Sequence, residues 1–280
     1  MHPVLFKIGG LTFYTYGLLM ALGFIAAYFL LLRLARVTKQ DGEFYSNMFF
    51  WMMVLGILGA KALYLLVGIR DLGEELKDVV GCLRGGLVWY GGLIADIIFV
   101  YFYSKSHQKS YLQVADTATA PTALGLAIGR IGCLMAGCCY GKPSELPWAI
   151  TYPPGETLPH PMAGIPVHPS PIYEAAGVLV IAVICWQLLL RSRRRGMALA
   201  MLVMLYALLR FGLEFLRGDL ERGVLFGSLS TSQFLSILMF ALAIGLLAYI
   251  LKKPPEAEKQ APPPPPSRKE KKKKAKEKVK

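Results

Sequence analysis

Charged residues are scarce in this chain: they make up 18% of its 280 residues, whereas 55% of the residues are hydrophobic. No charged residue interrupts residues 11–32 or residues 228–251, and about 20 apolar residues suffice for a helix to cross a bilayer. The mean hydropathy of +0.46 also exceeds that of soluble domains of this length. The composition therefore excludes an ordinary soluble domain and predicts a multi-pass membrane protein.

The sequence also lacks an even number of cysteines, a signal-peptide cleavage site and internal repeats, and each absence argues against a class of protein. The five cysteines are an odd number, so they do not indicate a disulfide framework. No small-residue cleavage pattern follows residues 11–32, which we therefore expect to stay as a transmembrane helix. The repeats that mark many secondary transporters are not visible in the sequence.

The hydrophobic runs predict an all-α fold, a polytopic membrane protein with seven transmembrane helices. The predicted ranges are 11–33, 46–67, 86–104, 112–131, 170–190, 197–216 and 230–251. Basic residues collect in alternate connections, at 33–39, 105–109 and 191–196, and again in the C-terminal tail. Since positive residues are retained in the cytoplasm, we expect a periplasmic N-terminus and a cytoplasmic C-terminus.

The C-terminal tail differs in composition from the rest of the chain. Residues 252–280 contain twelve Lys or Arg, four Glu and five consecutive prolines, and they carry +8 of the net charge of +13. Such a segment buries no core, so we divide the chain into a transmembrane domain at 1–251 and a disordered cytoplasmic tail at 252–280. Because the excess charge lies in this tail, beside an anionic membrane surface, it does not indicate nucleic-acid binding.

Polar residues within the predicted spans lie mostly toward the periplasmic side. They are Tyr14, Tyr16, Lys61, Tyr64, Trp89, Tyr90, Arg130, His168, Ser170, Tyr173, Glu174, Tyr206, Arg210, Glu214, Arg217, Thr231, Ser232 and Gln233. Asp96, near mid-depth, is the main exception. A charged residue at the centre of a membrane helix costs about 2.5–3.5 kcal/mol and usually faces a cavity or a partner. The pattern therefore predicts one polar cavity that opens to the outer leaflet.

Arg130 and Arg210 are the strongest candidates for ligand binding within this set. Arg130 stands among the glycines of GLAIGRIG at 125–132, a small-residue pattern that lets helices approach closely. Two arginines from two helices at one depth suit a phosphate group, because each guanidinium offers a planar fork of donors. Arg210 also lies four residues before Glu214, so a purely structural ion pair is the alternative for that arginine.

Other polar residues of this set have a structural interpretation as well as a functional one. Tyr14, Tyr64 and Trp89 can belong to the aromatic belt that many membrane proteins place at the interface. The glycine pairs at 85–86 and 91–92 permit close approach by a ligand, or they mark a helix end.

Three of the five cysteines, Cys133, Cys138 and Cys139, follow Arg130 closely. A metal site requires further ligands at a recognisable spacing, and His168 is the only evident addition, so we predict no metal and no cofactor. A disulfide between two of the cysteines is a second hypothesis, because the periplasm is oxidising. A nucleophilic role is a further alternative.

Six motifs together resemble those of bacterial prolipoprotein diacylglyceryl transferases. They are YTYGLLMALGF at 14–24, GILGAKALY at 56–64, GGLVWYGGLI at 85–94, GRIGCLMAGCCYGKP at 129–143, HPSPIYEA at 168–175 and YALLRFGLEFLRGD at 206–219. Because they follow in order and at matching depths, the resemblance extends from about residue 8 to residue 251. The basic tail lies outside it.

The resemblance implies an activity and two substrates. Members of this family take phosphatidylglycerol from the membrane and transfer its diacylglyceryl group to the lipobox cysteine of a preprolipoprotein. The reaction takes place at the periplasmic face of the bacterial inner membrane and yields a thioether and glycerol phosphate. The expected partners are therefore phosphatidylglycerol, preprolipoprotein signal peptides and membrane lipids, with no nucleic acid.

The motifs and the polar pattern together give the site residues that we expect. The expected catalytic residues are Arg130, Arg210, Tyr90, Tyr206, Glu214 and His168. The expected substrate-binding residues are Arg130, Arg210, Tyr16, Gly91, Gly92, Gly141, Tyr173 and Glu174. By resemblance, Arg130 and Gly141 match the arginine and the closing glycine of the family's signature motif. The residues Tyr16, Tyr206, Arg210 and Glu214 match polar positions of the first and sixth spans.

This chain departs from the family pattern at the residues proposed to move the proton. Tyr90 stands where many members have a histidine, and tyrosine, with a pKa of about 10, is a weak base at neutral pH. We keep Tyr90 and His168 as alternative bases. Cys133 and Cys138 stand where asparagine and glutamate are usual. A non-catalytic homologue that binds phosphatidylglycerol or prolipoprotein, or a lipid transporter, is therefore an alternative function.

Overall fold

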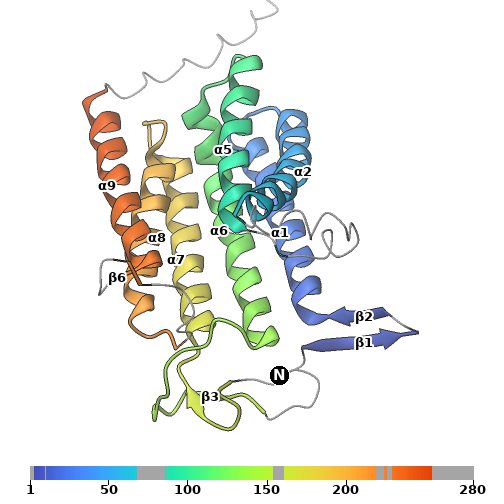
Figure 1. Cartoon of the computed structure of the whole chain (residues 1–280). Coiled ribbons are helices and arrows are strands. Elements are labelled where there is room, and N and C mark those ends of the chain that lie inside the picture. Colours follow the sequence, from blue (N-terminus) through green and yellow to red (C-terminus); the bar gives the residue numbers. More distant parts are fainter. Residues whose placement is uncertain are drawn as a thin grey trace, which may run out of the picture.

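Seven helices form most of the computed structural model, which describes residues 3–9, 11–67, 86, 88–153, 161–218, 224–225 and 229–253. The helices are α1 (Thr15–Val37), α2 (Gly42–Val67), α5 (Trp89–Ser106), α6 (Tyr111–Ala136), α7 (Ser170–Arg191), α8 (Met197–Glu214) and α9 (Thr231–Lys252). They match the seven predicted ranges to within a few residues, and α1 and α6 to α9 run lengthwise through the molecule (Figure 1). Most of the predicted tail, from residue 254 onward, lies outside the described residues.

Three short antiparallel strand pairs, which the sequence did not predict, accompany the helices of this mostly helical fold in the described residues. The pairs are β1 (Val4–Ile8) with β2 (Leu11–Tyr14), β3 (Ile150–Thr151) with β4 (Pro166–Val167), and β5 (Val224–Leu225) with β6 (Leu229–Ser230). The first helix therefore begins at Thr15 and not at residue 11. The reason is local: VLFKI and LTFY are rich in strand-forming residues, and Gly9 between them takes a φ of +56°, which suits a hairpin turn.

Six of the seven helices in the described part of the chain are long and apolar enough to cross a membrane, so the chain is a multi-pass membrane protein. The helix outside this set is α5, which has 18 residues and carries Asp96. At 1.5 Å per residue it spans about 27 Å, slightly less than the roughly 30 Å of a hydrocarbon core. The prediction of a span is thus supported for six helices and stays a prediction for α5.

Small residues let α1 and α6 approach closely. A Cβ atom on Gly23 of α1 would lie 3.0 Å from the carbonyl oxygen of Gly125 in α6. Further along α6, Gly132 lies against the ring of Tyr16. These contacts confirm the close helix approach that the glycines around Arg130 predict. Beyond this pair, α6 packs on α7, and α8 packs on both α7 and α9.

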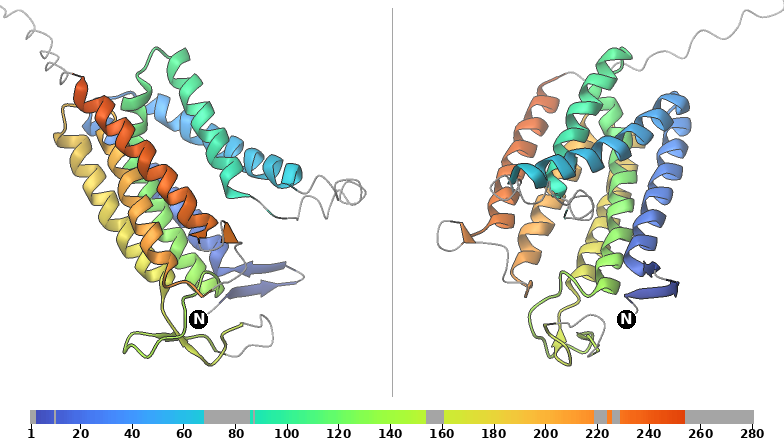
Figure 2. Two further views of the ribbon diagram at one scale, coloured as in Figure 1. Left: turned by 60° about the vertical axis from the view of Figure 1, so that its left-hand side comes forward. Right: turned by 45° about the vertical axis from the view of Figure 1, so that its right-hand side comes forward.

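Glycines also join α2 to α5. A Cβ atom on Gly92 would lie 2.7 Å from the carbonyl oxygen of Gly56, and Gly91 lies directly against Gly59. Apart from α2, α5 contacts α6 among the described helices. Figure 2 shows α2 lying obliquely to the helices α6 to α9, which run side by side. The α2–α5 pair therefore forms a separate flank of the bundle.

The two ends of the bundle differ in composition. One end holds the three basic connections and the end of α9, and the other holds the β1–β2 and β3–β4 pairs (Figure 1). At the basic end, Asp116 of α6 accepts hydrogen bonds from the backbone N–H groups of Gly196 at 2.6 Å and Leu199 at 2.8 Å. A carboxylate of one helix thus caps the start of α8.

Candidate active site

Arg130, near the end of α6, is held by a buried carboxylate. Its Nη2 atom lies 3.0 Å from Oε1 of Glu174 in the first turns of α7, and the two side chains are 19% and 4% exposed. The hydroxyl of Tyr206 on α8 donates a hydrogen bond to the same oxygen at 3.0 Å. Residues from three helices therefore meet at one point, at the end of the bundle that lies opposite the basic connections.

Arg210 lies one turn after Tyr206 on the same face of α8. Its Nη2 atom lies 3.1 Å from Oε2 of Glu214 and also donates to the hydroxyl of Ser232 on α9 at 3.2 Å. The i, i+4 ion pair that the sequence left open is therefore present. Tyr206, which lies one turn before Arg210, donates to the carboxylate that holds Arg130, so it connects the two arginines. The two arginines thus belong to one polar region.

Both arginines keep donors that their protein partners do not use. Among the described residues, neither Nε of Arg130 nor Nη1 of Arg210 has a hydrogen-bond partner, although both atoms are buried. A buried donor without an acceptor costs about 1–3 kcal/mol, and more when it is charged. An anion with several oxygen atoms would satisfy these donors, and phosphate matches the planar fork of a guanidinium.

Gly141 joins the loop after α6 to the segments that flank α7 and α8. Its N–H donates to the carbonyl oxygen of His168 at 3.0 Å, and the N–H of Lys142 donates to that of Leu216 at 2.8 Å. A Cβ atom on Gly141 would lie 2.5 Å from Cβ of His168 and 2.7 Å from Oγ of Ser170. The structure thus gives Gly141 a role in a tight backbone crossing, and its predicted contact with substrate stays a prediction.

Three thiols, here called the thiol cluster (Cys133, Cys138 and Cys139), lie beside Arg130. The three Sγ atoms are all within 4.8 Å of one another, and Nη1 of Arg130 lies 3.9 Å from Sγ of Cys139. Hydrogen bonds from the two other thiols, with a further contribution from Arg217, lower the pKa of Cys139 below that of an ordinary thiol. The four described cysteines form no disulfide with one another.

The thiol cluster is the part of the site that the sequence did not predict. Gly137 takes a φ of +74° and ends α6 in a Schellman motif. In it, the N–H of Cys138 donates to the carbonyl oxygen of Cys133 at 3.1 Å, and the N–H of Gly137 donates to that of Leu134 at 3.2 Å. The turn brings Cys138 back toward Cys133. A glycine four residues after Cys133 is the signal that could have revealed this return.

The other predicted residues divide into two groups. Tyr16 lies near Arg130 and Cys133, since its ring packs on Gly132, which stands between these two residues in α6. His168 and Tyr173 contact each other at the start of α7: Nδ1 of His168 is 3.4 Å from the hydroxyl of Tyr173, and that hydroxyl accepts a hydrogen bond from Nε1 of Trp148 at 2.7 Å.

Tyr90, Gly91 and Gly92 lie on α5 with different neighbours. Tyr90 is 45% exposed, and its ring packs against that of Trp89 with centroids 5.4 Å apart. Gly91 and Gly92 are buried against α2. Within the described residues, these three residues pack against α2 and Trp89 and not against Arg130. Their predicted roles in catalysis and binding stay predictions.

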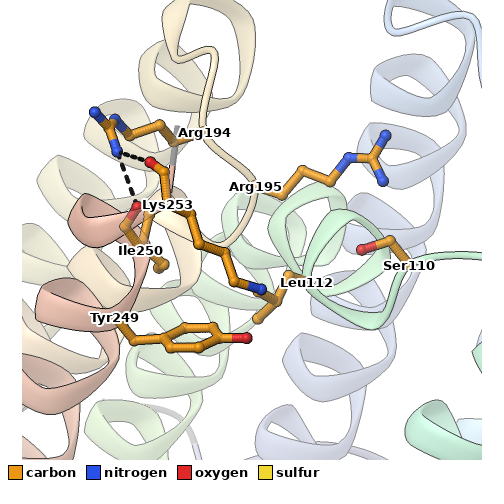
Figure 3. A pocket seen from close by; sticks show the side chains of 7 residues that line it. All are labelled: Ser110, Leu112, Arg194, Arg195, Tyr249, Ile250 and Lys253. Atoms are coloured by element: carbon orange, nitrogen blue, oxygen red, sulfur yellow. Dashed lines mark hydrogen bonds between the residues drawn. The ribbon is translucent and has the colours of Figure 1, made fainter. Parts of the chain in front are cut away.

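A separate hollow of about 260 Å³ lies at the basic end of the bundle. Figure 3 shows the residues that line it, which are Ser110, Leu112, Arg194, Arg195, Tyr249, Ile250 and Lys253. Nη1 of Arg194 donates to the carbonyl oxygens of Ile250 at 2.9 Å and Lys253 at 2.6 Å, so it caps the end of α9. This hollow lies far from Arg130, and we identify the candidate site by its buried, unused donors instead.

Comparison with known proteins supports a single family. The family model of prolipoprotein diacylglyceryl transferase matches residues 3–249. A relative from Clostridium tetani, named phosphatidylglycerol–prolipoprotein diacylglyceryl transferase, is 36% identical over 89% of this chain and 97% of its own length. Proteins of the same name from Finegoldia magna and Geobacter sulfurreducens are each 33% identical, over 85% and 87% of this chain and 91% and 93% of their own lengths.

Proposed function

The chain belongs to the prolipoprotein diacylglyceryl transferase family, and we propose that it transfers the diacylglyceryl group of phosphatidylglycerol to the lipobox cysteine of preprolipoproteins. The products are a thioether-linked lipid and glycerol phosphate. The site faces the periplasm at the bacterial inner membrane, with the basic connections in the cytoplasm. The observation that carries the proposal is the pair of guanidinium groups of Arg130, which is partly buried, and Arg210, which is buried; each has one buried donor without a partner among the described residues.

The phosphate of phosphatidylglycerol would lie between these two arginines. Nε of Arg130 and Nη1 of Arg210 would donate to its oxygens, while Glu174 and Glu214 hold the guanidinium planes in place. When the bond between the glycerol carbon and the phosphate oxygen breaks, negative charge grows on the leaving glycerol phosphate. Cations that are already oriented stabilise this charge without reorganisation, which lowers the barrier.

The acceptor thiol is the nucleophile of this reaction. A free thiol has a pKa of about 8.5, so a modest fraction is ionised at neutral pH, and nearby arginines raise that fraction. Nδ1 of His168 lies 3.4 Å from the hydroxyl of Tyr173, and Tyr90 lies on α5. These two side chains are the candidate bases.

Substitution of the arginines tests the phosphate clamp. Arg130→Ala and Arg210→Ala should each lower transfer of labelled phosphatidylglycerol to a lipobox peptide by roughly 10²-fold, the loss typical of one transition-state donor. Arg36→Ala, which removes an exposed arginine at the basic end of α1, is the matched control and should keep its activity. Undiminished transfer in both site variants would remove the clamp from the mechanism.

A non-catalytic lipid-binding homologue is the second candidate, favoured by Tyr90 at the position of the expected base. Complementation of a bacterial strain that lacks the transferase separates the two functions. Growth with lipid-modified prolipoprotein supports the enzyme. A chain that binds phosphatidylglycerol but releases no glycerol phosphate in the presence of a lipobox peptide is a binding protein.

A further inference from the structure

The thiol cluster has the dimensions of a metal site. Three thiolates around one zinc ion, with Zn–S distances of about 2.3 Å, lie roughly 3.8–4.0 Å from one another. In the structure the three Sγ atoms are within 4.8 Å of one another, so shifts of less than about 1 Å would place them around a common centre. The Schellman turn at Gly137 sets this arrangement through the backbone.

The ligand set leaves one coordination position open. Among the described residues, no histidine, aspartate or glutamate joins Cys133, Cys138 and Cys139 in the cluster. Cys138 is exposed and the other two thiols are partly exposed, so the cluster is accessible from outside. Structural zinc sites in proteins are closed by four protein ligands, whereas sites that act on a substrate have three and an open position.

The cluster also lies against the arginine that we assign to the lipid phosphate. The guanidinium of Arg130 contacts Glu174 through Nη2 at 3.0 Å and Cys139 through Nη1 at 3.9 Å. The thiol cluster and Glu174 therefore contact different nitrogen atoms of one guanidinium, and a ligand bound to the cluster would lie close to Arg130. That position suits the second substrate of a transfer reaction, since it adjoins Arg130, which we assign to the phosphate of the leaving group.

We propose that Cys133, Cys138 and Cys139 bind one Zn²⁺ ion and that the acceptor cysteine of the preprolipoprotein is its fourth ligand. This inference rests on the proposed transfer function. A coordinated thiol loses its proton to water, because the ion stabilises the thiolate. The thiolate electron pair then forms the S–C bond to the glycerol carbon, and the C–O bond to phosphate breaks. The electrons leave with glycerol phosphate, and the thioether, a weaker ligand than a thiolate, is released from the metal.

A zinc-bound thiolate removes the need for a strong protein base. The two candidate bases have other neighbours in the structure: Tyr90 packs on Trp89, and His168 hydrogen-bonds Tyr173. The thiol cluster, by contrast, contacts Arg130 directly. The metal would thus supply the activated nucleophile, and the arginines would stabilise the departing phosphate.

Metal analysis of the full-length purified protein tests the site independently of activity. After incubation with zinc chloride and removal of the excess, we expect about one zinc ion per chain in the wild type. Cys139→Ser and Cys138→Ser should lose it, whereas Cys185→Ser should retain it. Cys185 is a matched control, since it is buried in α7 and donates to the carbonyl oxygen of Ala198. Size-exclusion profiles and unfolding temperatures verify that each variant is folded.

X-ray absorption spectroscopy then tests the open position. The zinc should show three sulfur neighbours at about 2.3 Å alone and four after addition of a lipobox peptide, but three with a peptide that has serine in place of cysteine. A sulfur count that the cysteine peptide leaves unchanged would overturn the assignment. So would bound copper in place of zinc, or a disulfide within the cluster detected by mass spectrometry.

The same preparation distinguishes this inference from the proposed function. Full transfer activity in protein shown to be metal-free would overturn the zinc site and leave the transferase standing. Four sulfur neighbours with the peptide, but no transfer from phosphatidylglycerol, would support the site and contradict the transferase.

Discussion

Substitution of Glu174 by glutamine distinguishes the two interactions proposed for Arg130, one with a protein carboxylate and one with a lipid phosphate. Glu174 is 3% exposed, and its Oε1 atom accepts from Arg130 and Tyr206, each at 3.0 Å. Glutamine keeps the size and one oxygen acceptor but removes the negative charge. We expect Glu174→Gln to be less stable than the wild type without phosphatidylglycerol, and to be stabilised more strongly when the lipid is added.

The expected magnitude follows from the geometry of the pair. Two unit charges 3.0 Å apart interact by about 5 kcal/mol at an effective dielectric constant of about 20. Removing one partner of a buried ion pair costs about 3–5 kcal/mol, and the retained amide oxygen places glutamine at the lower end of this range. A phosphate at Arg130 would replace the lost charge. The affinity for phosphatidylglycerol should therefore rise at least tenfold, which is about 1.4 kcal/mol.

Thermal unfolding in nanodiscs provides the assay. The unfolding temperature is measured in phosphatidylcholine alone and as a function of added phosphatidylglycerol, because a ligand that binds only the folded state stabilises it by mass action. Glu145→Gln, at an exposed glutamate of the loop after α6, is the control for loss of a carboxylate. If phosphatidylglycerol stabilises the Glu174 variant and the wild type equally, the lipid phosphate does not lie close enough to Arg130 to offset the lost carboxylate charge.

Four further predictions concern other parts of the structure. Gly141→Ala should cost about 1–3 kcal/mol of folding free energy and lower the transfer rate, both measurable on purified protein, because its Cβ would lie 2.5 Å from that of His168. Asp116→Asn should lower the free energy of unfolding by about 2 kcal/mol without changing KM, since it weakens the cap of α8 far from the site. Burial raises the pKa of Tyr152 to about 12. The folded state therefore keeps a proton that the unfolded chain loses above about pH 10, so stability should fall between about pH 10 and 12, and Tyr152→Phe should reduce this slope. Tyr90→Phe should keep the transfer rate, because the ring packs on a neighbouring aromatic; a large fall would identify its hydroxyl as the base.

The helices could be located from the sequence because the membrane imposes both a length and a composition on each of them. The first boundary was wrong because β2 is also apolar: hydropathy does not distinguish Leu11–Tyr14 from the helix that follows. Only the pairing with β1 across Gly9 separates the two. The same limit applies to α5, whose Asp96 lowers its hydropathy without preventing helix formation.

At the site, the sequence identified the polar residues better than it identified their partners. The ion pair of Arg210 with Glu214 follows from helical spacing, and the structure confirms it. Glu174 was predicted to bind substrate, and nothing in the spacing indicated that it lies against Arg130. That contact depends on how α6 and α7 pack, which is tertiary information that a periodic pattern does not contain.

The turn after α6 carries both halves of the proposed chemistry. Arg130 lies on the helical side of this turn, and Cys139 of the thiol cluster lies on its loop side, 3.9 Å from the guanidinium. The distance between the arginine and the thiols is therefore set by the short segment 130–139. Gly137 fixes the start of that segment by its left-handed backbone, and Gly141 fixes its end against the residues before α7 and after α8. Transfer requires the nucleophile and the leaving group to be aligned within a fraction of an ångström. The backbone of this turn therefore determines the geometry of the reaction more directly than the packing of the seven helices does.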